Sequence, residues 1–256
     1  MLVALVTVGI VFIADQSPPP SAVARLGLGM LCLQFAIGLA NDVADRDADA
    51  RSKPWKPVAS GVLPPRTATF LAAAFSGLGL VVTASFGTGP WLVGVAGLHC
   101  GLLYDLFLKR TVLSWLPMVL AFPLIPVWVF GALDRWEPLL WWVFPIGGLL
   151  GLAVHLANQH PDIAADRRAG VRGIAQRAGG RAAFAISIGA LGAGLSIGAV
   201  VLVATGHAPQ AALVGLTGVV ALSLAPRAAR FFGRDGLFGT VAVSSALSAG
   251  AFLSAV

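Results

Sequence analysis

Long uncharged stretches alternate along the chain with short segments that hold nearly all of its charges. Seven stretches contain no Asp, Glu, Lys or Arg, and they cover residues 1–14, 26–41, 67–104, 111–133, 138–161, 182–226 and 236–256. A helix needs about 20 apolar residues to cross the hydrocarbon core of a bilayer. The two longest stretches are long enough for two such helices each, and Gly and Pro residues at 87–90 and 206–209 offer tight turns near their middles.

This division predicts nine membrane-spanning helices. We expect them near residues 1–14, 22–44, 66–86, 90–107, 112–132, 138–160, 182–204, 209–227 and 236–255. Helices are expected rather than strands, because backbone polar groups in lipid must be satisfied within the element and the alternation of a β-barrel is absent. The first segment is short and its apolar run has no basic region before it, so we expect no signal peptide. The predicted fold is an all-α, multi-pass membrane bundle that forms one domain over residues 1–256.

The composition excludes a soluble domain. The chain is 57% hydrophobic and 11% charged, with a mean hydropathy of +0.87, whereas about a quarter of the residues in soluble domains are charged. The net charge of +6 requires no nucleic-acid partner, because 15 of the 17 Lys and Arg residues fall in the connections after the second, fourth, sixth and eighth helices. By the positive-inside rule these connections face the cytoplasm. We therefore expect an integral protein of the cell membrane with these loops on the cytoplasmic side.

The acidic residues concentrate at the ends of two helices on that same side. Asp42, Asp45 and Asp49 follow the second helix with a spacing of i, i+3, i+7. Asp162 and Asp166 follow the sixth helix with a spacing of i, i+4. At these spacings each set is expected to line one face of its helix.

Each acidic group also begins with an asparagine, Asn41 in the first and Asn158 in the second. Carboxylate and carboxamide oxygens suit Mg²⁺, which proteins usually share between one or two carboxylates and the phosphates of a substrate. The carboxylates would repel one another without an anion bound through the metal, so the pattern favours a diphosphate ligand. In the alternative interpretation, the acids pair with nearby Lys and Arg as a solvated cytoplasmic rim.

Other polar residues are predicted on the same side of the membrane. Lys56 lies in a proline-rich loop and is able to reach phosphate oxygens as a point charge. Tyr104 and Lys109 end the fourth helix, where Tyr104 alternatively serves as an interfacial aromatic anchor. We expect His155 to be hydrogen-bonded between helices rather than to bind a metal, and Pro161 to kink the sixth helix beside Asp162.

Together these residues resemble the UbiA-type family of intramembrane prenyltransferases. The first motif of that family, Asn-Asp-x-x-Asp-x-x-x-Asp, is matched by Asn41, Asp42, Asp45 and Asp49, and the second, Asp-x-x-x-Asp, by Asp162 and Asp166. Residues 54–61 resemble the family's Pro-x-Arg-Pro-x-x-Ser-Gly in the spacing of its chlorophyll-synthase-like and archaeal-lipid branches, with Lys56 in place of Arg. Tyr104 and Lys109 resemble its Tyr/Lys element. After Asp166, residues 170–175 keep only the outline of the family's Gly-x-x-Thr-Leu-Pro.

The resemblance implies a helical bundle around a cavity that opens to lipid, with an isoprenyl diphosphate as donor and a lipophilic acceptor. Mg²⁺ is expected as the cofactor, held by Asp42, Asp45, Asp49, Asp162 and Asp166. Substrate-binding roles are expected for Asn41, Arg46, Lys56, Tyr104, Lys109 and Asn158. In the implied reaction the diphosphate leaves, and an aromatic carbon or a hydroxyl group of the acceptor captures the allylic cation.

Three other functions remain open at this point. A terpene cyclase on the same scaffold would use the same metal site, and a relative that transfers a phosphoribosyl group to a lipid phosphate also expels diphosphate. A secondary transporter or cation channel would place its acidic residues near the middle of the membrane. The acids of this chain lie at helix ends beside basic loops, which favours chemistry at the interface.

Overall fold

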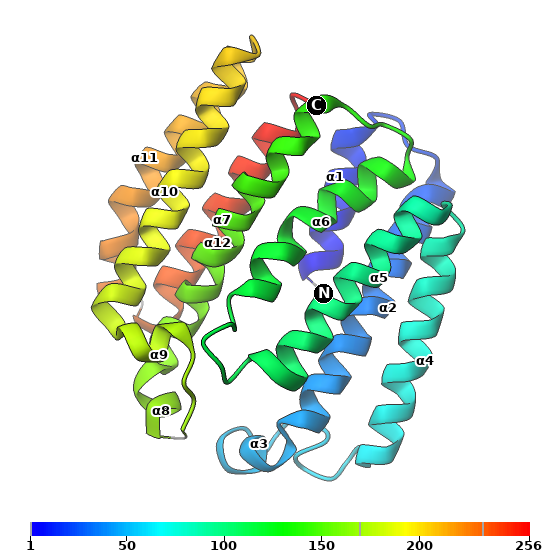
Figure 1. Cartoon of the computed structure of the whole chain (residues 1–256), viewed down its shortest axis with the longest axis vertical. Coiled ribbons are helices and arrows are strands. Elements are labelled where there is room, and N and C mark those ends of the chain that lie inside the picture. Colours follow the sequence, from blue (N-terminus) through cyan, green and yellow to red (C-terminus); the bar gives the residue numbers. More distant parts are fainter. Residues whose placement is uncertain (1, 169, 232) are drawn as a thin grey trace. The chain divides into compact units, whose positions relative to one another are not determined.

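The computed structural model describes residues 2–168, 170–231 and 233–256, and these residues form helices joined by turns (Figure 1). Within these described ranges, seven helical segments are long and apolar enough to cross a membrane: Pro20–Ala44, Pro65–Ala84, Thr88–Leu108, Pro138–Asp162, Gly180–Ala204, Ala208–Ala228 and Gly236–Leu253. Two further apolar helices in the described residues are shorter, namely α1 (Leu2–Ala14) and α6 (Leu116–Ala132). The predicted all-α, multi-pass fold is confirmed.

The long helices carry the labels of Figure 1. They are α2 (Pro20–Ala44), α4 (Pro65–Ala84), α5 (Thr88–Leu103) with the π-helical turn η1 (Tyr104–Leu108), α7 (Val143–Gln159) between the 3₁₀ turns η2 (Pro138–Trp142) and η3 (His160–Asp162), α10 (Gly180–Ala204), α11 (Ala208–Phe231) and α12 (Gly233–Leu253). Three short helices lie in the connections, namely α3 (Arg46–Ser52), α8 (Ile163–Arg168) and α9 (Ile174–Ala178).

Proline and glycine set several of the helix boundaries. Pro20 and Pro65 begin α2 and α4, where the missing N–H would have no partner within the helix. Gly87 and Gly206 adopt φ of +102° and +86° in the turns before α5 and α11, a conformation that favours glycine. The predicted start of the fifth spanning helix at residue 112 is wrong, because the chain turns there and Ser114 N donates to Thr111 O at 3.2 Å.

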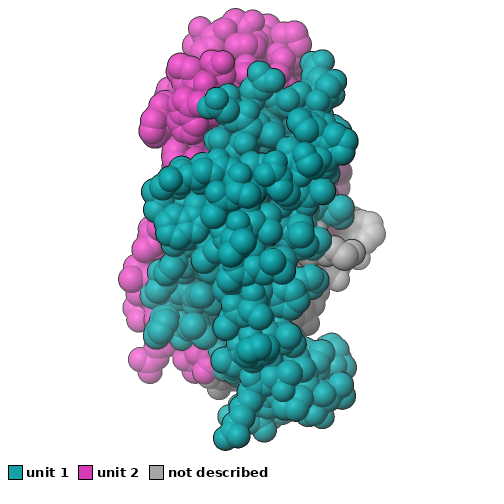
Figure 2. Space-filling model, turned by 90° about the vertical axis from the view of Figure 1, so that its right-hand side faces the viewer, with its two compact units in different colours: residues 1–109, 128–135 teal, residues 110–127, 136–256 magenta. Residues whose placement is uncertain are grey.

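The chain divides into two compact units (Figure 2). The first comprises residues 1–109 and 128–135, and the second comprises residues 110–127 and 136–256. The expectation that residues 1–256 act as a single domain stays a prediction.

In the first unit, α2 packs against α1, α4, α5 and η1. Leu33 and Ala36 of α2 are buried against Leu98 of α5. Helices in lipid associate through close packing rather than through the hydrophobic effect, so small residues are favoured where they meet. Gly79 of α4 meets this need, because a Cβ atom there would lie 2.8 Å from Leu33 Cδ2. Helix α2, which carries the start of the first aspartate motif, is therefore fixed by neighbours on several sides.

In the second unit, α7 packs against α10 and α12, and α11 packs against both α10 and α12. A buried apolar cluster below the second aspartate motif joins Leu156, Ile163, Ala175 and Ala183. These residues come from α7, α8, α9 and α10. The cluster therefore holds the short helices α8 and α9 against the long ones.

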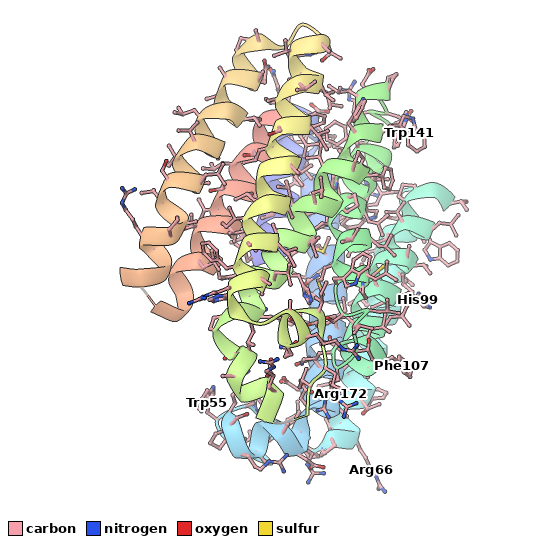
Figure 3. All side chains as sticks on the ribbon, turned by 60° about the vertical axis from the view of Figure 1, so that its left-hand side comes forward. Trp55, Arg66, His99, Phe107, Trp141 and Arg172 are labelled. Atoms are coloured by element: carbon pink, nitrogen blue, oxygen red, sulfur yellow. The ribbon has the colours of Figure 1, made fainter. Side chains whose placement is uncertain are left out.

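Apolar side chains also remain exposed on the outer faces of each unit. Leu213, Leu216 and Val219 are exposed on α11, as expected for a helix that faces lipid. Trp55, Phe107 and Trp141 project away from the ribbon (Figure 3). Tryptophan and phenylalanine of this kind suit the interfacial and lipid-facing regions of a membrane protein. With its many apolar helices, the chain is an integral membrane protein.

Candidate active site at the two aspartate motifs

The first aspartate motif spans the break between α2 and α3. Asp42 belongs to α2, Asp45 lies at the junction with φ −94° and ψ 4°, and Asp49 belongs to α3. Backbone hydrogen bonds of 2.9 Å from Asp45 N to Asn41 O and 2.8 Å from Asp49 N to Asp45 O carry the chain across the break. The prediction that these carboxylates line one face of a single helix is therefore wrong, because the helix is interrupted at Asp45.

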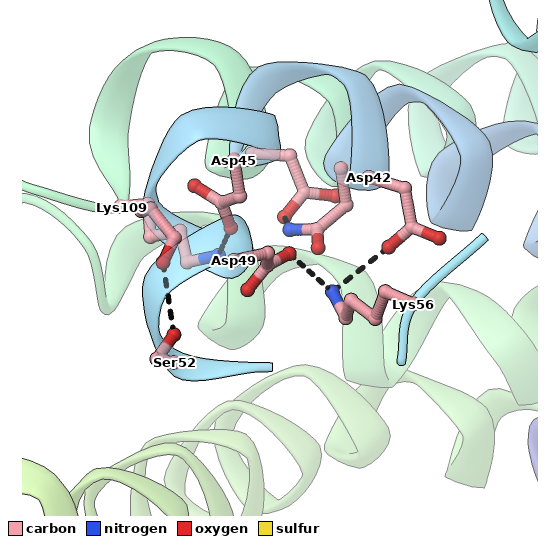
Figure 4. Close-up of polar contacts among 9 residues, drawn as sticks. Asp42, Asp45, Asp49, Ser52, Lys56 and Lys109 are labelled. Carbon is pink, nitrogen blue, oxygen red and sulfur yellow. Dashed lines mark hydrogen bonds and ion pairs between the residues drawn. The ribbon is translucent and has the colours of Figure 1, made fainter. Parts of the chain in front are cut away.

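Two lysines reach the three carboxylates of this motif (Figure 4). Lys56 Nζ lies 2.8 Å from Asp42 Oδ1 and 2.8 Å from Asp49 Oδ2. Lys109 forms an ion pair with Asp45. Burial lowers the pKa of Lys56, but the hydrogen bonds to Asp42 and Asp49 outweigh it and raise the pKa above its usual value. Pairing with lysines is thus real, but Asp49 is only 5% exposed, so the motif is not a solvated rim.

The π-helical turn η1 brings two polar side chains to the first motif. Lys109 N donates to Tyr104 O at 2.8 Å, five residues back, and π-helical turns of this kind often mark functional sites. Asn41 Nδ2 donates to Asp105 Oδ1 at 2.6 Å, across 64 positions of sequence. Because an ionised carboxylate only accepts hydrogen bonds, this contact fixes which end of the Asn41 amide points to Asp105.

Asp105 is a candidate site residue that the sequence motifs did not assign. It lies inside the Tyr104–Lys109 segment and precedes Lys109 by four positions. That spacing at the end of an apolar helix was the available signal, because residues four apart share a helix face. Tyr104 itself is half-buried on η1.

The second aspartate motif also lies where a helix changes form. Helix α7 ends at Gln159, the 3₁₀ turn η3 contains Pro161 and ends at Asp162, and α8 carries Asp166. The predicted disturbance of the helix at Pro161 is confirmed, since proline removes a backbone donor. Asp162 and Asp166 therefore belong to two different helical turns rather than to one continuous helix.

A buried glutamine contacts the second motif. Gln176 of α9 donates from Nε2 to Asp166 Oδ2 at 2.9 Å, and its residue is 2% exposed. No spacing in the sequence pointed to Gln176, which lies just beyond the segment where the chain departs from the family pattern. Asn158, which was expected to contribute, lies exposed on α7.

His155 and Arg46, two further residues noted in the sequence, differ in what the structure shows for them. His155 is buried, and its Nε2 lies 3.3 Å from Ser114 Oγ, so the expected hydrogen bond is present, but to a turn before α6 rather than to another helix. Arg46 is exposed at the start of α3. Its role in substrate binding stays a prediction.

The first motif has suitable groups for a hard cation. Among the described residues no three His, Cys, Asp or Glu side chains gather closely enough to hold a metal, because Asp45 turns to Lys109. Asp42 and Asp49, however, both place an oxygen 2.8 Å from the single ammonium nitrogen of Lys56. Two carboxylates converging on one cationic centre match the way proteins hold Mg²⁺ with a phosphorylated substrate.

The fold and these motifs define a helical membrane protein with acidic and basic side chains gathered at helix ends. The sequence profile of the UbiA prenyltransferase family matches residues 2–254. The chain belongs to this family, which confirms the resemblance drawn from the motifs and the expected class of enzyme, a transferase of prenyl groups.

One curated relative is the digeranylgeranylglyceryl phosphate synthase of Hyperthermus butylicus, which is 31% identical over 163 residues. The aligned segment covers 59% of this chain and 54% of that protein, so the match spans about half the length of the relative.

Solved structures of UbiA homologues share the fold. One from Archaeoglobus fulgidus, bound to GPP and Mg²⁺, has a TM-score of 0.77 at 17% identity and covers 99% of this chain and 95% of its own. The apo form of a homologue from Aeropyrum pernix K1 has a TM-score of 0.74 at 20% identity, with coverages of 99% and 98%. A digeranylgeranylglyceryl phosphate synthase structure has a TM-score of 0.78 at 13% identity, with coverages of 98% and 92%.

Proposed function

We propose that this protein is a Mg²⁺-dependent prenyltransferase that moves an isoprenyl group from an allylic diphosphate to a lipophilic acceptor. The observation that carries the proposal is the convergence of Asp42 and Asp49 on one ammonium nitrogen, each at 2.8 Å. The Archaeoglobus fulgidus homologues were solved with GPP or DMAPP together with Mg²⁺, which supports the same donor class here.

The aspartates of both motifs are assigned to the metal. Asp42, Asp45 and Asp49 would hold Mg²⁺ in the first motif, and Asp162 and Asp166 in the second. Mg²⁺ held by these carboxylates would neutralise the diphosphate and stabilise it as a leaving group. We assign both motifs to one reaction, so the loss of either should stop turnover.

The other polar residues bind and orient the substrate. Lys56 and Lys109 carry the ammonium groups nearest to the first motif and would contact phosphate oxygens as point charges. Asn41, with its N–H group bound to Asp105, would direct its carbonyl oxygen toward the bound ions. Supporting roles are also assigned to Arg46, Tyr104 and Asn158.

The reaction breaks the bond between the allylic carbon and the diphosphate oxygen. The diphosphate leaves with the bonding electron pair, and an acceptor oxygen bonds to the carbon and loses its proton to solvent. The name of the Hyperthermus butylicus relative points to a glyceryl phosphate lipid, so we favour a hydroxyl of such a lipid over an aromatic carbon. The positive-inside rule applied to the basic loops supports the cytoplasmic face of the cell membrane as the side of this chemistry.

The test uses the purified full-length protein in lipid nanodiscs with Mg²⁺, allylic diphosphates of several chain lengths and a prenylated glyceryl phosphate acceptor. We expect diphosphate release together with a lipid product whose mass equals acceptor plus prenyl group, and loss of both after EDTA treatment. Release with a cyclised hydrocarbon as product would replace the transferase with a cyclase. No release from any of the diphosphates would overturn the proposal.

A further inference from the structure

The carboxylate of Asp166 has a neutral, fully buried hydrogen-bond donor. Gln176 Nε2 donates to Asp166 Oδ2 at 2.9 Å, and Gln176 is 2% exposed. The orientation of the amide follows from chemistry, because only its NH₂ group is able to donate to a carboxylate. The contact joins α9 to α8 within the second unit.

The surroundings of Gln176 leave its side chain little freedom. Its neighbour Ala175 is fully buried in the apolar cluster with Leu156 and Ile163, which fixes α9 in place. Arg172 N donates to Arg110 O at 3.2 Å and anchors the segment before α9; the Arg172 side chain is labelled in Figure 3. These contacts hold α9, a helix of five residues, in place and so limit the directions in which the Gln176 side chain can point.

Gly173 provides the space that the amide occupies. A Cβ atom at Gly173 would lie 2.5 Å from Gln176 Oε1 and 3.4 Å from Ser114 Oγ. A side chain at position 173 would therefore require the end of the Gln176 side chain to move from its present place.

Packing alone does not explain a glutamine at this position. Gln176 Oε1 is buried and has no hydrogen-bond partner among the described residues. A buried polar atom without a partner is unfavourable, so an apolar side chain of similar size would pack better. The compensating feature is the single hydrogen bond to Asp166.

We infer that Gln176 is a positioning residue that fixes the orientation of the Asp166 carboxylate toward the metal and diphosphate. An amide donor orients a carboxylate without itself adding a positive charge, whereas a lysine at 176 would add one. Outer partners of metal-ligating carboxylates commonly have this role. The inference rests on the proposed function, because that function assigns Asp166 to Mg²⁺.

The test measures metal binding directly, with Mn²⁺ as a substitute visible by electron paramagnetic resonance and inorganic pyrophosphate as the headgroup probe. Gln176→Met removes the donor and keeps the length of the side chain, and Gln176→Glu keeps the shape but places a second carboxylate against Asp166. The matched controls are Gln159→Met and Gln159→Glu, because Gln159 is another buried glutamine of the same unit with an unpartnered Oε1.

We expect both Gln176 variants to bind Mn²⁺ about tenfold or more weakly, with the Glu variant the weaker, while their melting temperatures stay close to those of the Gln159 controls. The Gln159 controls should bind Mn²⁺ as the wild type does. Wild-type affinity in the Gln176 variants, or equal weakening in the Gln159 variants, would overturn this inference alone. A wild-type protein that binds no Mn²⁺ with pyrophosphate would overturn the proposed function as well.

Discussion

The two aspartate motifs hold their carboxylates with different kinds of partner. In the first, Lys56 and Lys109 place full positive charges on Asp42, Asp45 and Asp49. In the second, the donor to Asp166 is the neutral amide of Gln176. Both motifs lie where a spanning helix ends and a short helix begins.

The contacting groups differ in charge: Lys56 and Lys109 in the first motif are cationic, whereas the Gln176 amide beside Asp166 is neutral. Three aspartates within eight positions repel one another, so ammonium groups stabilise them in the folded chain, and a metal or substrate must compete with those groups. In the second motif, Gln176 gives the half-buried Asp166 an uncharged donor, which orients the carboxylate without competing for the metal as a cation would. Removal of partners from the first motif should therefore affect stability and activity, and removal of the partner from the second should affect mainly metal affinity.

The largest effect is expected from the carboxylates themselves. Asp45→Ala and Asp162→Ala should each lower the rate of diphosphate release by about 10³-fold, because each removes charge that stabilises the departing group through the metal. Asp47→Ala is the matched control, since Asp47 is exposed and lies two positions after Asp45, in α3. Full activity in one variant but not the other would show that only one of the two motifs takes part in the reaction.

A smaller effect is expected when Lys56 is replaced. Lys56→Met should lower kcat/KM for the allylic diphosphate by about 10-fold to 100-fold, in the range of a lost charge-assisted contact. It should also lower the melting temperature without metal, because Asp42 and buried Asp49 then face each other without a cation.

Added Mg²⁺ should raise the melting temperature of Lys56→Met more than that of the wild type. Thermal unfolding with and without the metal measures this difference. Lys53→Met is the control, because Lys53 lies exposed in the same loop. If Mg²⁺ raised the melting temperature of Lys56→Met and Lys53→Met equally, Lys56 would not be the group that neutralises the carboxylates of the first motif.

The smallest effect is expected at Asp105, which contacts the motif through Asn41. Asp105→Ala should lower kcat/KM by about tenfold, since the amide of Asn41 loses the acceptor that orients it. Asp105→Asn keeps a carbonyl acceptor and should recover most of that loss. Steady-state kinetics at saturating and limiting Mg²⁺ measure kcat/KM for both variants. If Asp105→Asn were as impaired as Asp105→Ala, the positioning role of Asp105 would be contradicted.

Much of the fold was predictable from the order of apolar and charged residues. Backbone groups in lipid must form their hydrogen bonds within a helix, so each long uncharged stretch, such as 182–226 with its turn at Gly206, dictates helices of known length. The start of α6 was misplaced because residues 111–115 are uncharged yet form turns, and hydropathy does not distinguish a turn from a helix.

The sequence by itself was enough to predict the class of the protein, because the Asn and Asp residues at 41–49 and 162–166 form the motifs by which the chain resembles its family. It did not determine the partners of those residues. The contact of Asn41 with Asp105 joins positions 64 apart, and the contact of Gln176 with Asp166 depends on the turn between α8 and α9 and on the space beside Gly173. Such contacts depend on how distant segments pack, and local spacing carries no information about packing between segments. The tertiary structure alone decided that Lys56 and Lys109 pair with the first motif and that Gln176 contacts Asp166.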